Sequence, residues 1–343
     1  MNFSDQTILI TGAAGFIGYH LAKRILTQCP TARVVGLDDM NDYYDVSLKQ
    51  ARLDELKALG DRFAFTRGSI ADKPLVDALF RECRPDVVVN LAAQAGVRYS
   101  ITHPEAYIQS NLVGFFNILE ACRHSYDGGS GVRHLVYASS SSVYGTNAKV
   151  PYSTDDKVDS PVSLYAATKK ADELMAHAYS KLYGIPATGL RFFTVYGPMG
   201  RPDMAYFGFT NRMVRGEKIQ LFNNGDMYRD FTYIDDVVTG VVNVMGRAPE
   251  PNADGVRYAL YNIGNHNPES LLDFVQTLEE CLMEAGVIDH PAEKEFLPMQ
   301  PGDVYRTFAD VEPLARDFGF RPSTPLREGL RRYARWYREY YGR

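Results

Sequence analysis

The sequence predicts an α/β protein built on a doubly wound parallel sheet, followed by a smaller C-terminal α/β domain. The first half of the 343-residue chain alternates short, almost continuously apolar runs with helical stretches. Strands that are apolar along their whole length are typical of parallel sheets, whose crossover helices cover both faces. A glycine-rich turn directly follows the first apolar run, as in the doubly wound folds that bind dinucleotides. The length agrees with about two domains.

Six apolar runs are expected to form the strands of this sheet, because each is rich in Val, Ile, Leu or Phe. In chain order they cover residues 7–10, 33–37, 63–66, 86–91, 134–138 and 187–193. The helices expected between them cover residues 16–27, 49–59, 73–83, 105–124 and 165–183. Gly184, with Pro186 beyond it, is a common signal for the end of a helix and predicts where the last one stops.

The texture of the sequence changes after Tyr196. Gly, Pro, Met and aromatic residues crowd residues 197–209, and the regular alternation is lost. We therefore expect residues 1–195 to form a dinucleotide-binding domain, with part of 231–265 returning to it. Residues 196–343 are expected to form mainly the substrate domain.

Two features of the C-terminal half are interpreted as structural. Four aromatic residues recur at helical spacing near the end of the chain, namely Tyr333, Trp336, Tyr337 and Tyr340. Such a stripe predicts a face that packs against the rest of the protein rather than a ligand site. Asp235 is expected to cap a helix over residues 236–245.

Composition excludes several classes of function. The difference between 37 Lys and Arg and 42 Asp and Glu is a net charge of −5, so no strong basic field would attract nucleic acid. No apolar run approaches the length of a membrane span, and no signal peptide fits before the first strand. The four cysteines lack C-x-x-C spacing and the seven histidines lack metal-binding spacing. We expect reduced thiols in a cytoplasmic protein and no metal site.

The glycine-rich turn has the spacing GxxGxxG, with Gly12, Gly15 and Gly18. Glycines let the backbone approach a pyrophosphate, and the N-terminus of the following helix offers unpaired N–H groups. Asp38 ends the second predicted strand 20 residues after Gly18, where an acid can accept hydrogen bonds from the ribose of adenosine. The same acid would repel a 2′-phosphate, so NAD is expected rather than NADP. The alternative is a tight turn without a ligand.

A second motif, YAATK, pairs Tyr165 with Lys169. Residues at i and i+4 lie on one face of a helix, and an ammonium near a phenol favours the phenolate, which can act as a general base. The alternative is a surface tyrosine beside a solvated lysine. A third motif, the serine run 139–142, leaves the carboxyl end of the fifth strand. Ligands of doubly wound sheets bind at that edge. Hydroxyls there can orient a sugar, although such a run can also be a polar turn.

In this order the three motifs resemble the extended short-chain dehydrogenase/reductase family, over essentially the whole chain. Within the family the sequence is similar to the nucleotide-sugar epimerases, most of all to those that act on UDP-glucuronate. Four longer strings carry this closer similarity: LAAQAGVRYS (91–100), LRFFTVYGPMGRPDM (190–204), YRDFTYIDD (228–236) and QPGD (300–303).

The resemblance implies a role for each matching residue. Tyr165 would be the catalytic base, Lys169 its activator and Ser140 the hydroxyl that shares the substrate proton. Besides Tyr165 and Lys169, the residues implied to hold NAD are Gly12, Gly15, Phe16, Ile17, Gly18, Asp38, Ser69, Ile70, Leu91, Ala92, Ala93 and Asn111. The residues implied to contact the UDP-sugar are Ser141, Ser142, Thr194, Arg201, Phe222, Arg229 and Asp303.

Within the set implied to contact the UDP-sugar, the resemblance assigns individual residues to different parts of the ligand. Arg201 falls where uronate-specific members bind the carboxylate. Arg229 and Asp303 would hold the pyrophosphate and the uridine ribose, and Phe222 would pack near the uracil. Family members commonly form homodimers through the helices that span about 105–122 and 165–183 here.

Two positions depart from the family pattern. Ser69 stands where an Asp often follows the third strand, which leaves one adenine hydrogen bond without its usual acceptor. Gln300 stands where galactose-type epimerases often have Arg, so Arg306 is a candidate for that charge.

The reaction implied is reversible epimerisation of UDP-glucuronate to UDP-galacturonate through a 4-keto sugar, with NAD regenerated in each cycle. A dehydratase would carry an Asp-Glu pair where Ser141 and Ser142 stand, and a UDP-glucuronate decarboxylase usually carries Glu at the latter position. Two other reactions remain alternatives: epimerisation of a neutral UDP-hexose, with a structural Arg201, and decarboxylation of UDP-glucuronate. So does a cofactor-bound protein without turnover.

Overall fold

The computed structural model describes residues 3–129, 131–299 and 304–342. Its larger half is a seven-stranded sheet in the order β10-β6-β5-β4-β1-β2-β3, with every neighbouring pair parallel. The strands are β1 (Thr7–Thr11), β2 (Arg33–Asp38), β3 (Phe63–Arg67), β4 (Val87–Asn90), β5 (His134–Ser140), β6 (Ala187–Phe192) and β10 (Tyr258–Ile263). The strand order reverses between β1 and β4, and ligands of such sheets bind beyond the carboxyl ends of the strands at that point. The predicted doubly wound fold is confirmed.

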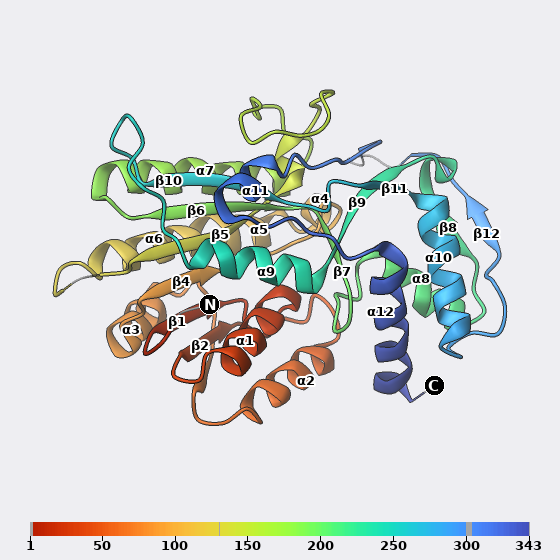
Figure 1. Ribbon diagram of the computed structural model, residues 1–343, viewed down its shortest axis with the longest axis horizontal. Helices are drawn as coiled ribbons and strands as arrows, with labels where there is room; N and C mark the ends of the chain where they lie inside the picture. Colours follow the sequence, from red (N-terminus) through yellow and green to blue (C-terminus); the bar gives the residue numbers. More distant parts are fainter. Residues whose placement is uncertain (1–2, 130, 300–303, 343) are drawn as a thin grey trace.

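Helices cover both faces of this sheet (Figure 1). One face packs against α1 (Phe16–Gln28), α2 (Val46–Lys57) and α9 (Ile234–Met245). The other packs against α3 (Lys73–Cys83), α6 (Gly114–His124) and α7 (Leu164–Tyr183). Side chains of β1 alternate between the two cores, with Ile8 and Ile10 on the first side and Leu9 on the second. This is the two-residue period of a strand that is buried on both faces.

The second and fourth predicted helices differ from their predicted limits by more than one residue. The helix expected over 49–59 begins at Val46, because the carboxylate of Asp45 accepts a hydrogen bond from the backbone N–H of Ser47 at 2.9 Å. The single helix expected over 105–124 is instead α5 (Pro104–Tyr107), a π-helical turn η1 (Ile108–Val113) and then α6. The short helix α4 (Tyr99–Thr102) precedes them.

The smaller half lies beside the carboxyl edge of the parallel sheet (Figure 1). It contains a three-stranded sheet, β11-β9-β7, and a two-stranded sheet, β12-β8. Their strands are β7 (Thr194–Tyr196), β8 (Ile219–Leu221), β9 (Tyr228–Tyr233), β11 (Pro268–Ser270) and β12 (Lys294–Phe296). Its helices are α8 (Ala205–Val214), α10 (Leu271–Glu284) and α12 (Leu326–Tyr341), and its 3-10 turn is η3 (Phe222–Gly225). Two further elements belong to the larger half: the 3-10 turn η2 (Ser141–Tyr144) directly follows β5, and α11 (Glu312–Phe318) packs against β10, where the ring of Phe318 lies 5.2 Å from that of Tyr261.

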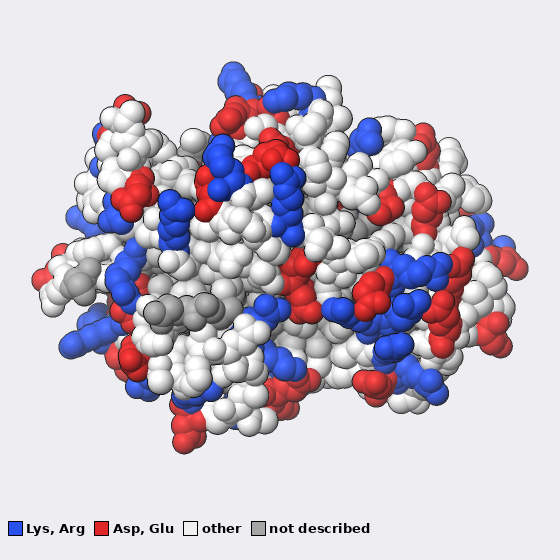
Figure 2. All heavy atoms as spheres, in the orientation of Figure 1, with Lys and Arg blue, Asp and Glu red and all other residues white. Residues whose placement is uncertain are grey.

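The aromatic stripe near the end of the chain packs inward, as predicted. On α12, Tyr333 and Tyr337 are buried, and the rings of Tyr333 and Trp336 each lie 5.9 Å from that of Phe207 on α8. The solvent face of α12 instead carries charges. Figure 2 shows basic and acidic side chains interleaved in this region, and Arg327 and Arg331 pair there with acids of α10.

Asp235 corrects one expectation. It does not cap α9, which begins one residue earlier at Ile234 without a side-chain cap. Its carboxylate instead lies 3.4 Å from Arg24 and 3.6 Å from Arg332, so it links α9 to α1 and α12. Within the described ranges, no helix has both the length and the apolar character needed to cross a bilayer.

Candidate active site

A cleft of about 690 Å³ lies between the carboxyl edge of the parallel sheet and the smaller half. It brings together most of the residues singled out from the sequence. These lining residues are Gly12, Gly15, Phe16, Ile17, Gly18, Asp38, Ser69, Ile70, Leu91, Ala92, Ala93, Ser140, Ser141, Ser142, Tyr165, Lys169, Thr194, Arg201, Phe222 and Arg229. The cleft is therefore the candidate active site.

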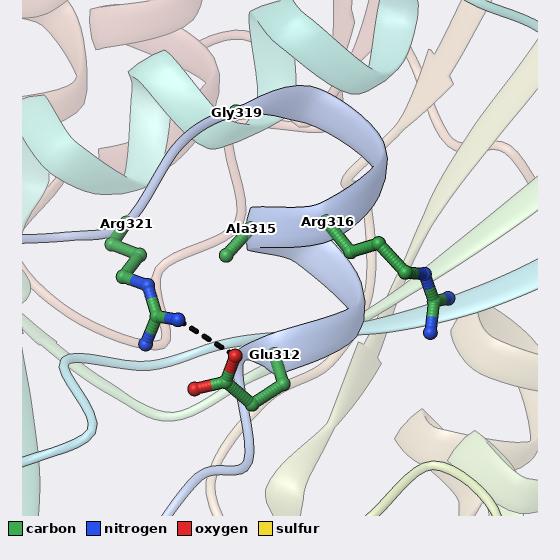
Figure 3. Close-up of a pocket in the computed structure, with 5 residues that line it drawn as sticks. All are labelled: Glu312, Ala315, Arg316, Gly319 and Arg321. Atoms are coloured by element: carbon green, nitrogen blue, oxygen red, sulfur yellow. Dashed lines mark hydrogen bonds and ion pairs between the residues drawn. The ribbon is translucent and has the colours of Figure 1, made fainter.

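A second hollow, of about 520 Å³, lies on α11 and is a weaker candidate. Figure 3 shows Arg321 and Glu312 pointing toward one another across it, joined by an ion pair of 2.6 Å, while Arg316 points away. Its opposite charges are thus already paired, and none of the three sequence motifs reaches it.

The glycine turn closes tightly against the sheet. Gly12 has a φ of +70°, and a Cβ at this residue would lie 2.8 Å from the backbone nitrogen of Ala92. A Cβ at Gly18 would lie only 2.1 Å from the carbonyl oxygen of Gly12. The helix α1 begins after Gly15 with no side-chain cap, which leaves its first N–H groups for an anion. This geometry fits the pyrophosphate of a dinucleotide.

Asp38 lies at the end of β2, only 6% exposed and directly beside this turn. Its carboxylate accepts hydrogen bonds from the backbone N–H groups of Ala14 at 3.1 Å and Met40 at 2.9 Å. Burial raises the pKa of Asp38, and the ammonium of Lys49, 3.9 Å away, opposes that shift. Lys49 is a cleft residue that the sequence analysis missed.

Tyr165 and Lys169 stand on the first turns of α7, which is capped where the hydroxyl of Ser163 accepts a hydrogen bond from the N–H of Ala166 at 3.1 Å. Both residues line the cleft, and the lysine side chain is only 3% exposed, so the alternative of a solvated surface lysine is wrong. The ammonium donates to the carbonyl oxygen of Ala138 at 3.0 Å and to Asp172 at 3.1 Å. The second partner was not foreseen.

The serine run continues β5 and then turns. Ser140 is the last residue of the strand, two residues beyond the predicted end, and its hydroxyl accepts a hydrogen bond from the N–H of Ser142 at 3.1 Å. This hydrogen bond caps the start of the 3-10 turn η2. Ser141 and Ser142, the first two residues of the turn, are partly exposed. The hydroxyl of Ser139 instead donates to buried Glu173 at 2.7 Å.

Arg201 forms a partly buried ion pair with Asp203. Its Nε donates to Oδ1 at 3.0 Å, its Nη2 contacts Oδ2, and the two side chains are 24% and 22% exposed. Burial alone would lower the pKa of Arg201 and raise that of Asp203, but their mutual attraction reverses both shifts. The hydroxyl of Tyr43 donates to Asp203 at 3.2 Å. Asp203 and Tyr43 also line the cleft, and neither was assigned to it from the sequence.

The far end of the cleft combines rings and guanidinium groups. The guanidinium of Arg98 lies 4.9 Å above the ring of Phe222, so the predicted phenylalanine has a cationic neighbour that was not singled out. Arg229 donates to the carbonyl oxygens of Tyr228 at 2.9 Å and Tyr305 at 3.2 Å.

Four other predicted positions differ from these. Asn111 does not line the cleft; it is buried in η1, where its side chain accepts from the N–H of Gln94 at 2.8 Å and donates to Thr168 at 2.9 Å. The hydrogen bond between the side-chain amide of Asn111 and Gln94 supports the loop that follows β4. Asp303 and Gln300 lie outside the described residues. Arg306 is exposed above the ring of Tyr228, 5.4 Å away.

Comparison with known proteins identifies the family. Residues 8–264 match the model of the NAD dependent epimerase/dehydratase family. The chain therefore belongs to this family, which confirms the family expected from the motifs.

Three relatives illustrate its neighbourhood. Protein CapI of Staphylococcus aureus is 49% identical, over 97% of this chain and 99% of that one. A probable UDP-glucuronate 4-epimerase of Rhizobium meliloti is 43% identical, over 98% of each chain. The crystal structure of UDP-glucuronic acid 4-epimerase from Bacillus cereus, in complex with UDP-glucuronic acid and NAD, has a TM-score of 0.86 at 33% identity. That match covers 98% of this chain and 100% of the other.

Proposed function

We propose that this member of the NAD dependent epimerase/dehydratase family inverts C4 of UDP-glucuronate, giving UDP-galacturonate reversibly. The observation that carries the proposal is the position of Arg201 in the same cleft as Tyr165, Lys169 and the serine hydroxyls. A cation in the same cleft as the acid–base pair suits a sugar that bears a carboxylate. The similarity to 4-epimerases of UDP-glucuronate, over 98% of the chain, supports the same substrate.

NAD is the cofactor of this proposal. The glycine turn would receive its pyrophosphate, because a Cβ at Gly12 or Gly18 would collide with backbone atoms and the N-terminus of α1 has no side-chain cap. Asp38 would accept from the adenosine ribose, and Ser69 and Ile70 would flank the adenine. When bound, NAD supplies reversible uptake of hydride, so the reaction consumes no external oxidant.

The acid–base work falls to Tyr165. We assign to its phenolate the removal of the proton from the C4 hydroxyl and the return of that proton to the product. Lys169, one helical turn away on α7, would be its activator. Ser140 would share the moving proton through its hydroxyl. Between the two transfers, the 4-keto sugar has to turn its opposite face toward the nicotinamide.

The carboxylate imposes an extra demand, because a 4-keto uronate is a β-keto acid that loses CO₂ readily. Decarboxylation is fastest when the bond to the carboxylate stands perpendicular to the ketone plane. We assign to Arg201, Thr194 and the hydroxyls of Ser141 and Ser142 the task of holding the carboxylate away from that geometry. A carboxylate held by hydrogen bonds also loses CO₂ more slowly than a desolvated one.

The nucleotide would occupy the end of the cleft formed by Phe222 and Arg229. With this arrangement we propose that residues 1–195, joined by part of 231–265, bind NAD. Residues 196–343 would mainly bind the nucleotide sugar.

A second substrate class has one observation in its favour. Arg201 already has a carboxylate partner in Asp203, so a neutral sugar would not leave it unpaired. Epimerisation of a neutral UDP-hexose is therefore the competing assignment.

We further propose a cytoplasmic homodimer. All four cysteines are unpaired thiols, as is usual in reducing compartments. Large apolar side chains are exposed on α4, α6 and α7, with Ile101 64%, Phe116 42% and Leu174 60% exposed. A second copy of the chain would cover them. Light scattering of the purified protein tests this; a monomer at micromolar concentration would exclude it.

Incubation of the purified protein with UDP-glucuronate, without added NAD, tests the reaction. Proton NMR should show a mixture with UDP-galacturonate and no accumulating NADH. Formation of UDP-xylose or a 4-keto-pentose would indicate a decarboxylase. Turnover of UDP-glucose in preference to UDP-glucuronate would favour the neutral hexose.

A further inference from the structure

A second carboxylate lies beside the catalytic lysine. Asp172 follows Lys169 by three residues on α7, and its Oδ2 accepts a hydrogen bond from the ammonium at 3.1 Å. The two side chains are 3% and 2% exposed, so water screens the pair very little. The other oxygen, Oδ1, is buried and has no hydrogen-bond partner among the described residues.

The next residue provides a contrast. Glu173 is also buried, but it accepts two hydrogen bonds from Arg191, at 2.7 and 2.9 Å, and one from Ser139 at 2.7 Å. These contacts join α7 to β5 and β6, which is a structural role with satisfied oxygens. Among the described residues Asp172 makes no comparable connection, because the hydrogen bond of its side chain goes to Lys169 on its own helix. A buried carboxylate with an unsatisfied oxygen destabilises a fold, so a structural role does not explain it.

We propose that Asp172 is a positioning residue that limits how strongly Lys169 favours the phenolate of Tyr165, and so sets the pH range of catalysis. When Asp172 is ionised, its charge opposes the field of the ammonium at the phenol. When it is protonated, the full field of the ammonium acts on the phenol. The inference rests on the proposed acid–base role of Tyr165.

The surroundings of Asp172 support a carboxyl group that changes its charge in the working range. Burial raises the pKa of Asp172 to about 6, although the charge of Lys169 opposes this shift and that of Glu173 adds to it. From the sheet, Tyr137 on β5 lies within electrostatic range of Asp172, and its hydroxyl is hydrogen-bonded to that of Tyr258 at 2.7 Å. Among the described residues, Lys169 is the cation that contacts Asp172, whereas Lys170 and Arg191 pair with Glu173.

Two anions would then compete for one ammonium. A phenolate at Tyr165 disfavours ionisation of Asp172, and an ionised Asp172 disfavours the phenolate. Coupled groups of this kind release their protons over a wider pH range than a single group does. The rate of the wild-type protein should therefore rise with pH more gradually than a one-proton titration allows.

The test is the pH dependence of kcat and kcat/KM for UDP-glucuronate in the wild-type protein, Asp172→Asn and Asp172→Ala. Asparagine keeps the shape and the acceptor for Lys169 but removes the charge. We expect its ascending limb to move about one pH unit toward acid and to steepen to a one-proton slope. The alanine variant should move the limb in the same direction, and it serves the same purpose if the asparagine variant does not fold.

Asp77→Asn is the matched control, because Asp77 forms a solvent-exposed pair with Lys73 at 2.7 Å on α3. Its profile should coincide with that of the wild-type protein. A melting temperature changed by Asp172→Asn without any movement of the limb would overturn the inference and leave the proposed reaction intact. A wild-type protein that turns over neither UDP-glucuronate nor UDP-glucose would overturn both.

Discussion

The two ends of the cleft are built in different ways. At the cofactor end, the shape comes from the backbone: Gly12 and Gly18 have no room for a Cβ, and the first N–H groups of α1 have no side-chain cap. At the substrate end, the shape comes from side chains that meet across the two halves of the molecule, such as Asp203 with Tyr43 and Phe222 with Arg98.

This difference teaches what each end can tolerate. A site shaped by the backbone depends on volume. Adding one methyl group should therefore weaken ligand binding strongly, and changing a nearby charge should weaken it little. A site of paired side chains depends on charge and hydrogen bonding, so conservative changes of volume should be mild. Substitutions at the two ends, and at the junction between them, test this comparison.

The largest effect is expected at the junction, for Tyr165→Phe. Loss of the hydroxyl removes the general base and acid, which should lower kcat by about 10²–10⁴-fold. The ring contact with Tyr107, 6.0 Å between centroids, can persist, so neither end should lose its ligand. Initial rates by NMR and the NAD content of the protein measure both. Tyr183→Phe, at the exposed end of the same helix, is the control. Rates within twofold of wild type would instead show that Tyr165 is not the general base, and a wild-type protein with no measurable rate would support a binding protein without turnover.

Next in size should be Gly18→Ala at the cofactor end. The new Cβ would lie 2.1 Å from the carbonyl oxygen of Gly12, and the backbone of the turn has to move. Overpacking of this kind costs about 1–3 kcal/mol, which corresponds to roughly 5–150-fold weaker NAD binding. Calorimetric titration with NAD measures it. Gly208→Ala on α8, where a Cβ meets nothing within 4 Å, should leave NAD binding unchanged.

These two ends also differ in how far the sequence predicts them. The glycine turn, the acid after β2 and the Tyr–Lys pair are local patterns, and the residues named from them line the cleft together. Tyr43 could not be assigned in this way, because it meets Asp203 across 160 positions of sequence. Asp172 is only three residues from Lys169, yet spacing alone does not reveal that the pair is buried. Asp235 shows the same limit, since its partners Arg24 and Arg332 come from distant helices.

At the substrate end, Arg201→Ala should raise KM for UDP-glucuronate about 10–100-fold, because a charge-assisted contact contributes about 1.5–3 kcal/mol. KM for UDP-glucose should change little. A pentose product should appear, because the carboxylate is no longer held away from the geometry that favours loss of CO₂. Competition between the two sugars, followed by NMR, separates these effects. Equal losses for both sugars would make the arginine structural and remove the uronate assignment.

The smallest effect is expected for Tyr43→Phe, which also tests whether the two ends are independent. Tyr43 comes from the loop after Asp38, but its hydroxyl donates to Asp203 at the substrate end. Burial raises the pKa of Tyr43 to about 12, so the hydroxyl remains a donor throughout the physiological range. Losing one such bond costs about 0.5–1.5 kcal/mol, so KM for UDP-glucuronate should rise roughly 2–10-fold while NAD affinity stays constant. If NAD affinity falls as well, the loop that carries Tyr43 couples the two ends of the cleft, and they are not independent.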